Sequence, residues 1–459
     1  MSLFGNSSQL YFDFVYSDYM KEHSEFKYLL DLIDMIDWSV VPDFSNKMGR
    51  TGYSRRALLK AIFVQKVKGF TVRELIHFLK SNPSFAKCIG FDPIINYVPS
   101  EATFSSFKKE FGPSYLDKVI VFTVLKGIKE GIFDTSYLVA DSYPIVFNSF
   151  FNNKKSHGKF KDYKEYYRSP LEANFGVKPV SNSKPIYDKY GNPKNAMSYL
   201  GYKAHTITFL NVPIFTVVSP ASANDKNYAF VLLEKVVKYL DLSGFNFLAD
   251  AAYDSSDLYD YVHLKTGSIA FIPLHSSSKK GLVGECGKKL VKHSHYLESK
   301  RNIYRTKFVC DDPSNCPLGR SNCYSYRNYS KYDFRHFLNR ESPFFKEIYK
   351  KRTLIESIFS RLESNNGTTS LKYTNAVQLE CNLSNLFLIA SALLAHKMGR
   401  DDLLSSPKTL MYETASQLVP LEGLNPFQYF PNERLFINRT SFMGIFPKKL
   451  FNSNYFSIF

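Results

Sequence analysis

Two short stretches decide the fold: Leu138-Val-Ala-Asp141 and Phe247-Leu-Ala-Asp250 are both apolar runs that stop at an aspartate. Such a run predicts a buried strand whose C-terminal end presents a carboxylate, at the edge where catalytic and metal-binding groups gather in open α/β sheets. The sequence therefore predicts an α/β core with Asp141 and Asp250 close together. Asp254 competes with Asp250, but with Asp257 it has the pattern of a capped helix start, which favours Asp250.

A third carboxylate is expected on a helix over residues 348–363. At about 100° per residue, Tyr349, Arg352 and Glu356 fall within one sector of that helix, beside its apolar stripe. Glu356 would then reach inward and complete a divalent-metal site with the two aspartates. The alternative is an ordinary amphipathic helix with an exposed Glu and Arg.

The charge balance indicates a polyanionic partner. The chain of 459 residues carries 59 Lys+Arg against 42 Asp+Glu, for a net charge of +17. Nucleic acid is the default partner of so basic a protein, and a basic but unrelated enzyme is the alternative. The length predicts two or three domains. No targeting signal is visible, and the most apolar stretch, residues 383–394, is interrupted by polar residues, so we expect a buried helix in a soluble intracellular protein.

The N-terminal third is expected to be all-helical. Residues 54–69 start at a capping Ser and stop at Gly69, residues 71–79 open with a capping box, and residues 100–111 form another helix. The pattern is typical of a helix-turn-helix domain. Its cations would contact phosphates or form a solvated charged face: Lys60, Lys66, Lys68, Arg73, Lys108 and Lys109.

The middle of the chain reads as strands and a helix around the two aspartates. The first strand should be broken by Pro144, and residues 148–194 have the character of an irregular insertion. Residues 199–208 and 212–218 are expected to be consecutive strands, and a helix should run from about Asp225 to Leu240.

The 106 positions between Asp250 and Glu356 exceed what a strand and a helix need, so we expect a basic insertion over residues 276–344. It contains Cys286, Cys310, Cys316 and Cys323, which are either free thiols or a structural zinc site. The tight Cys-x2-Cys pairs of common zinc ribbons are lacking. The insertion also contains His293, His295 and His336 as further donors.

Taken in order, these segments resemble bacterial insertion-sequence transposases of the DDE type, which belong to the ribonuclease-H-like superfamily. Residues 49–111 resemble their N-terminal domain. Residues 201–205, 219–225 and 249–255 resemble stretches of their catalytic domain. The family signature spaces Tyr, Arg, Glu and Lys by two, three and six residues, and Tyr349, Arg352 and Glu356 match it. Glu363 stands where the lysine is expected, and Arg361 or Lys372 would have to substitute.

The resemblance implies that Asp141, Asp250 and Glu356 are the catalytic residues and hold two Mg²⁺ or Mn²⁺ ions. The expected reaction is cutting of the element ends, followed by transfer of the 3′-hydroxyl ends to target DNA. The expected partners are double-stranded DNA, as terminal repeats and target, and a second copy in a homodimer, with no membrane. The protein would be cytoplasmic, and associated with the nucleoid when bound to DNA. The expected DNA-binding residues are Tyr349, Arg352, Lys203 and Arg361.

The expected fold class is α/β, with a ribonuclease-H-like catalytic core, a mixed sheet with flanking helices, an insertion, and a preceding all-α domain. The expected division is a helical DNA-binding domain over 1–130, core over 131–275, insertion over 276–344, the rest of the core over 345–400 and a tail of unknown role over 401–459. Two other functions fit the sequence: a ribonuclease-H-like nuclease that cuts without joining, and a catalytically decayed copy that only binds DNA.

Overall fold

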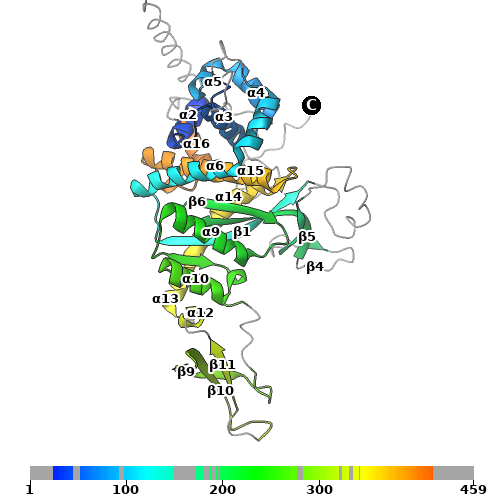
Figure 1. The fold of residues 1–459 in the computed structure, drawn as a ribbon, viewed down its shortest axis with the longest axis vertical. Helices are drawn as coiled ribbons and strands as arrows, with labels where there is room; N and C mark the ends of the chain where they lie inside the picture. Colours follow the sequence, from blue (N-terminus) through cyan, green and yellow to red (C-terminus); the bar gives the residue numbers. More distant parts are fainter. Residues whose placement is uncertain are drawn as a thin grey trace, which may run out of the picture.

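The structure is a computed structural model of the chain, and it describes residues 24–44, 52–91, 98–148, 172–179, 186–187, 193–194, 196–275, 283–319, 323–329, 334–340 and 342–416. The fold is mixed α/β, as expected: a helical N-terminal region, a mixed sheet with flanking helices, and a small separate sheet. In Figure 1, the small sheet and the N-terminal helices lie at opposite ends of the molecule.

From residue 24, where the described part begins, the N-terminal region contains the helices α2 (Ser24–Met35), α3 (Arg55–Lys68), α4 (Val72–Ser81), α5 (Pro83–Ile89) and α6 (Glu101–Lys129). Local signals set their ends as predicted. The Ser54 side chain caps α3, Gly69 ends it in the left-handed conformation, and Thr71 forms a capping box with Glu74 at the start of α4. The expected helix from residue 100 continues as α6, which is kinked at Gly112 before Pro113.

The main sheet contains β2 (Asn174–Pro179), β5 (Ala196–Thr208), β1 (Tyr137–Phe147), β7 (Asn246–Ala249) and β8 (Ile269–Phe271), in that order. In addition, β6 (Pro213–Pro220) pairs with β5, and β12 (Thr368–Thr369) pairs with β1. Strands β1, β7 and β8 are parallel, whereas β5 is antiparallel to β1. Two short strands, β3 (Ile186–Tyr187) and β4 (Pro193–Lys194), form a separate pair.

Two expectations for this sheet are wrong. Strand β1 runs through Pro144, which lies opposite Lys203 of β5, so the proline does not break the strand. The stretch expected to be irregular contributes β2, which pairs with β5 through Asn174 to Pro179. The backbones of β1 and β5 approach closely at Gly201, where an added Cβ would lie 2.0 Å from the carbonyl oxygen of Ile145, so only glycine fits there.

Helices cover the sheet and continue to the end of the described chain: α9 (Asp225–Leu240), η1 (Ala251–Tyr253), α10 (Ser256–Thr266), α12 (Phe334–Phe337), α13 (Pro343–Lys350), η2 (Lys351–Ile355), α14 (Glu356–Asn366), α15 (Thr374–Lys397), η3 (Asp401–Leu403) and α16 (Pro407–Ser416). The expected strands 199–208 and 212–218 and the helix from Asp225 are confirmed as β5, β6 and α9. The tail over 401–459, to which the sequence gave no role, contains η3 and α16; residues 417–459 lie outside the described residues.

The predicted buried helix at residues 383–394 lies in α15. This helix is long and apolar enough to cross a membrane, yet 89% of its most apolar window is buried in the fold. Figure 1 shows it beside α6, between the main sheet and the N-terminal helices, and its buried apolar residues form part of the interior of the protein.

Three of the cations expected to contact phosphates are instead engaged inside the helical region. Lys66 and Lys108 lie 3.1 and 3.8 Å from the Glu380 carboxylate of α15, and Lys66 also donates to Asn366. Lys68 is buried, with its ammonium group 5.8 Å from the centre of the Phe70 ring. These side chains hold α3 and α6 against α15, because a cation taken out of water needs a partner.

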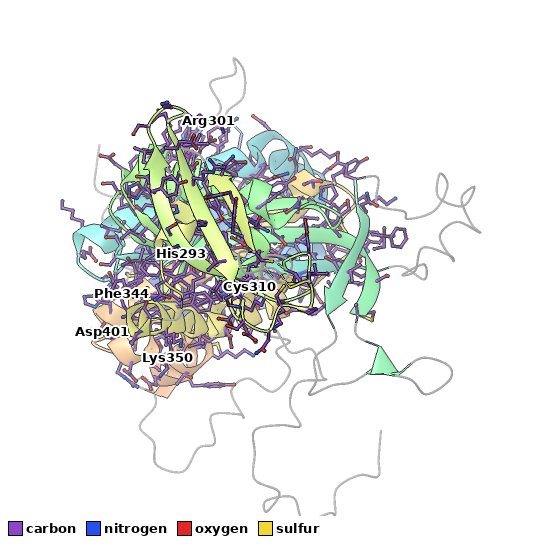
Figure 2. The ribbon with its side chains drawn as sticks, turned by 90° about the horizontal axis from the view of Figure 1, so that it is seen from below. His293, Arg301, Cys310, Phe344, Lys350 and Asp401 are labelled. Atoms are coloured by element: carbon purple, nitrogen blue, oxygen red, sulfur yellow. The ribbon has the colours of Figure 1, made fainter. Side chains whose placement is uncertain are left out.

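The small sheet contains β9 (Leu290–Glu298), β10 (Ile303–Cys310) and β11 (Tyr324–Tyr329), all antiparallel. It falls in the region where the basic insertion was expected, and it projects from the core as an arm (Figure 1). Figure 2 looks onto this arm, with Arg301 at one end of the sheet and Cys310 towards the other.

Candidate active site

Strand register brings Asp141 and Asp250 together. Ala140 of β1 pairs with Ala249 of β7 in a parallel ladder, and the next residue on each strand is an aspartate. Asp250 also begins η1, where its carboxylate accepts a hydrogen bond from the Ala252 amide at 2.9 Å. The two carboxylates thus lie together where the β1–β7 ladder ends, as predicted. The expectation that the first strand stops at Asp141 is wrong, because β1 continues to Phe147 and Asp141 pairs with Thr206 of β5.

Arg352 connects the segment that carries Tyr349 and Glu356 to these two aspartates. Its guanidinium donates to the Asp141 carboxylate at 2.6 Å. The pKa of Arg352 is raised: burial alone would lower it, but the charges of Asp141, Tyr349, Asp250 and Glu356 outweigh burial. All three predicted carboxylates therefore lie within electrostatic range of one guanidinium. The phenol ring of Tyr349 stacks on Phe345, with ring centres 5.7 Å apart.

The expected continuous helix over residues 348–363 is wrong in detail. Tyr349 lies near the end of α13, Arg352 lies in the 3₁₀ segment η2, and Glu356 is the first residue of α14. The helical winding therefore changes between Tyr349 and Arg352, and again at Glu356. Glu356 is solvent-exposed, as a ligand-facing carboxylate at a helix start would be.

Asp141 lies in an environment that disfavours its charge. Burial raises its pKa to about 6; Arg352 and the Ser142 amide lower it, and the charges of Asp250 and Asp225 raise it further. Among the residues that the structure describes, Asp250 and Glu356 form no ion pair. Negative charge is therefore in excess at this edge of the sheet.

Asp225 is a fourth carboxylate near this edge, to which the sequence reasoning gave no role. It begins α9 and lies 3.2 Å from both the Lys203 ammonium and the His205 Nδ1 atom. The His205 ring stacks on Tyr228 and its Nε2 lies 2.8 Å from the Ser219 hydroxyl. Burial alone would raise the pKa of Asp225, but His205 and Lys203 outweigh it and lower it. One sequence signal could have indicated this cluster: Lys203 and His205 are two residues apart on one expected strand, so both side chains point to the same face of the sheet.

Asp254, the competitor of Asp250, is held inside the fold. Its side chain is fully buried, accepts two hydrogen bonds from Arg335 at 2.7 and 2.5 Å, and accepts another from the His275 amide at 2.8 Å. It does not cap the next helix, since that role belongs to Ser255 at the start of α10. With its acceptor positions occupied, Asp254 is a structural residue.

Glu363, which stands where the family signature has lysine, has an ion-pair partner in the structure. Glu363 forms an ion pair with Lys178 of β2, and both side chains are partly exposed. A cation is thus placed beside the position where the signature carries lysine, although it comes from a different strand.

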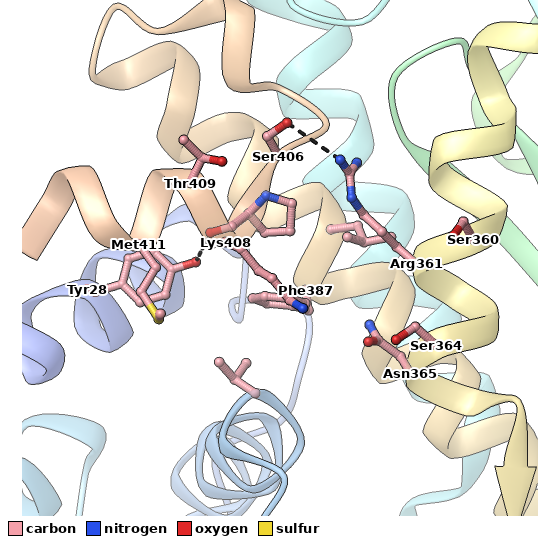
Figure 3. A pocket seen from close by; sticks show the side chains of 13 residues that line it. Tyr28, Ser360, Arg361, Ser364, Asn365, Phe387, Ser406, Lys408, Thr409 and Met411 are labelled. Atoms are coloured by element: carbon pink, nitrogen blue, oxygen red, sulfur yellow. Dashed lines mark hydrogen bonds between the residues drawn. The ribbon is translucent and has the colours of Figure 1, made fainter. Parts of the chain in front are cut away.

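Arg361 faces a different part of the molecule from Arg352. It lines a cavity of about 490 Å³ formed by residues of α2, α3, α14, α15 and α16. Figure 3 shows its guanidinium near Ser406, to whose hydroxyl it donates at 3.5 Å. Burial lowers the pKa of Arg361, and among the residues that the structure describes no carboxylate forms an ion pair with it.

Three of the four cysteines expected to bind zinc come together. The sulfur atoms of Cys286, Cys316 and Cys323 lie within 4.8 Å of one another, and Cys310 is outside this group. His295 lies in β9, with its Nδ1 atom 2.6 Å from the Thr306 hydroxyl and its ring stacked on Tyr304. The side chain of His336 lies outside the described residues.

The residues at the sheet edge fit a divalent metal. Carboxylate oxygens are the ligands that Mg²⁺ and Mn²⁺ prefer, and Asp141, Asp250 and Glu356 supply them from three segments. The excess of negative charge, together with the burial that raises the pKa of Asp141, is the condition that a bound cation would relieve.

Comparisons with known proteins agree with this chemistry. Residues 17–110 match the family described as a transposase domain (DUF772), and residues 175–392 match the transposase DDE domain. Asp250 and Glu356 fall within the second match, and Asp141 lies between the two. No curated protein matches the chain. A solved structure of the piggyBac transposase synaptic complex with hairpin DNA is 12% identical and covers 91% of this chain and 85% of that chain, with a TM-score of 0.31.

The two family matches define the class of protein. The chain belongs to the DDE transposases of insertion sequences, and it is a metal-dependent DNA transposase. Members of this family act on DNA with divalent metal ions.

Proposed function

We propose that this transposase cuts the ends of its insertion sequence and transfers the freed 3′-hydroxyl ends to target DNA, with Asp141, Asp250 and Glu356 as its catalytic residues. The observation that carries the proposal is the convergence of these carboxylates around Arg352 at one edge of the sheet. We further propose that the protein acts as a homodimer on double-stranded DNA, in the cytoplasm and at the nucleoid.

The three carboxylates would hold two Mg²⁺ or Mn²⁺ ions. When bound, such ions lower the pKa of a water or hydroxyl nucleophile and stabilise the leaving oxygen. Asp141 and Asp250 approach from rigid neighbouring strands, whereas Glu356 approaches from the first turn of α14. Ligands fixed on three separate elements favour one geometry, because backbone order limits their movement.

The remaining side chains position the site. Arg352 orients Asp141 through the 2.6 Å contact, and we propose that its planar guanidinium also binds a DNA phosphate beside the reacting bond. Tyr349, stacked on Phe345, would contact the DNA backbone or a distorted base. His205 and Lys203 hold Asp225 in place; a DNA contact by Lys203 would compete with this ion pair.

Arg361 is proposed to bind phosphate at a separate place, because it is a half-buried cation beside an open cavity and has no carboxylate partner within the described part of the chain. The rest of the proposal concerns domains: residues 1–130 would bind DNA, 131–275 and 345–400 would form the catalytic core, and 276–344 would be a basic insertion. The role of the chain beyond residue 400 is not assigned.

The test is an assay on a DNA fragment that carries the sequences flanking the gene. Purified protein is incubated with Mg²⁺ or Mn²⁺, and cleavage and joining are followed for the wild type, Asp250→Asn and Glu356→Gln. We expect metal-dependent cleavage and joining that both variants lose. Glu347→Gln is the matched control, because Glu347 is an exposed glutamate of the adjacent helix α13, and it should retain activity.

Two outcomes would overturn the proposal. Cleavage without covalent joining to target DNA would identify a nuclease instead. Specific DNA binding without cleavage, under either metal, would identify a decayed copy, and Glu363 would be the first residue to test because it departs from the family signature.

A further inference from the structure

The arm formed by β9, β10 and β11 has almost no hydrophobic core of its own. Of its described residues, 283–319 and 323–329, the buried ones are Leu290, Thr306 and Cys310. Units this small bury too little apolar surface to offset the entropy of ordering the chain, and they usually rely on disulfides or metal ions. The described strands of the arm therefore need a further source of stability.

Three cysteines converge where such a cross-link would be most effective. The start of β9, the end of β10 and the start of β11 share one end of the sheet, since Leu290 pairs with Cys310 and Val309 pairs with Tyr324. Cys286 precedes β9, Cys316 follows β10, and Cys323 precedes β11. One ion bound there would join all three segments.

The loops around the cysteines are shaped by backbone hydrogen bonds. Gly287, directly after Cys286, has a left-handed conformation, and its amide donates to the Gly284 carbonyl. Gly319 is also left-handed and donates to the Cys316 carbonyl at 2.9 Å. The Cys310 amide donates to the Cys323 carbonyl at 3.0 Å, which ties the β10 end to the β11 start. The thiols are therefore presented by ordered turns.

Disulfide formation does not account for this arrangement. All three sulfur atoms lie within 4.8 Å of one another, and none of the three cysteines is in a disulfide. A disulfide joins two sulfur atoms and would leave the third without a partner. A tetrahedral ion with bonds of about 2.3 Å to sulfur places its ligands a little under 4 Å apart, so three thiolates around one ion fit the observed spacing.

We propose that Cys286, Cys316 and Cys323 bind one structural Zn²⁺ ion, with the fourth donor supplied by Cys310 or solvent. Thiolate ligands favour zinc over the hard cations suited to carboxylates. Lys288, which pairs with Asp312 at 2.9 Å, lies within electrostatic range of Cys286 and Cys310, so a positive charge stands beside this cluster. This site is separate from the carboxylates and does not depend on the proposed reaction.

The first test measures zinc in the purified full-length protein by elemental analysis. We expect about one zinc ion per chain. Each of Cys286→Ser, Cys316→Ser and Cys323→Ser should lose most of it. Cys88→Ser, which changes an exposed cysteine of α5, is the matched control and should retain it. Asp250→Asn should also retain it, which excludes adventitious zinc at the catalytic carboxylates.

A second measurement on the wild type covers the case in which a variant fails to fold. Titration with a thiol-modifying reagent should release zinc in step with the modification of three cysteines. Chelation should make the arm, but not the core, sensitive to limited proteolysis. Protein purified without zinc, full zinc retention in the three variants, or bound iron in place of zinc would each overturn the proposal.

Discussion

Two clusters in this protein both bring lysine or arginine side chains against carboxylates, but they differ in the ratio of cations to carboxylates. In the helical region, two cations, Lys66 and Lys108, face one carboxylate, Glu380; its negative charge is fully compensated, and we call this cluster balanced in that sense. At the sheet edge, Arg352 faces Asp141, Asp250 and Glu356, so carboxylates outnumber cations. The balanced cluster joins helices, whereas the unbalanced cluster is prepared for a bound cation. The excess charge thus distinguishes the proposed active site from a structural ion pair.

The largest expected effect is at the unbalanced cluster. Asp250→Asn should lower DNA cleavage on the order of 10²–10³-fold, because it removes a charged group from the reacting centre. The apparent Tm of the metal-free protein should not fall, since the change relieves repulsion with Asp141. Activity assays check the loss of cleavage, and thermal unfolding checks the Tm. A marked fall in Tm would show that Asp250 is a structural residue.

The balanced cluster should respond in the opposite way. Glu380→Gln should lower the free energy of unfolding by about 2 kcal/mol, because it leaves two lysines inside the fold without a counter-charge. The loss is smaller than for a fully buried pair, since the Glu380 side chain is 30% exposed. Denaturant unfolding measures the effect. Glu110→Gln, which breaks the surface pair with Arg55, should change stability by less than about 0.5 kcal/mol.

Arg352→Lys sharpens the comparison, because it keeps the positive charge but replaces the planar guanidinium with an ammonium group. Loss of one hydrogen bond to a charged group is worth about 1.5 kcal/mol, so we expect activity to fall about tenfold. The apparent Tm should stay near that of the wild type. Unchanged activity would mean that positive charge alone, rather than the planar guanidinium, serves the site.

The pH dependence of stability should reveal the charge of Glu380. Burial alone would raise its pKa, but Lys66 and Lys108 outweigh it and lower the pKa below the usual 4.5. A carboxyl group with a depressed folded pKa stabilises the protein above its unfolded pKa, and this contribution is lost as pH falls through the folded pKa. The stability difference between wild type and Glu380→Gln should therefore be constant above about pH 4.5 and shrink below it. A difference that persists in acid would mean that the charge of Glu380 is not responsible.

The smallest expected effect concerns the exposed pair of Lys178 and Glu363, each 41% exposed. Glu363→Lys alone should lower stability by about 0.5 kcal/mol, because it places two cations together. Exchange of the two residues should restore the lost stability, and a double-mutant cycle measures the coupling energy between positions 178 and 363. If the single variant also raises transposition, the signature position itself is functional.

Local signals predicted much of the fold and of the candidate site. The capped ends of α3 and α4 could be read because Ser54, Gly69 and Thr71 act within one turn of the chain. The strand residues that precede Asp141 and Asp250 could be predicted from continuous apolar runs, but the continuation of β1 beyond Asp141 to Phe147 could not.

Interactions between segments far apart in the sequence could not be predicted from such local signals. No local pattern shows that Glu380 lies against Lys66, or that Arg335 occupies Asp254, because these pairs form across 314 and 81 positions of sequence. The 3₁₀ turn at Arg352 was missed for a related reason: a spacing of three residues fits both windings, and packing against the sheet selects one.

The arm also has a consequence for how this protein can change over time. It leaves the core after β8 and returns at α12, where Arg335 contacts Asp254; in α13, which follows, the Phe345 ring lies 5.8 Å from the Phe271 ring of β8. Segments inserted between neighbouring points of a framework can be lengthened, exchanged or removed at little cost to the framework, since the entropy of closing a loop grows slowly with its length. The same point of attachment would accept a fluorescent reporter or an affinity tag, and it would give descendants of this gene room to acquire new contacts while the chemistry stayed fixed.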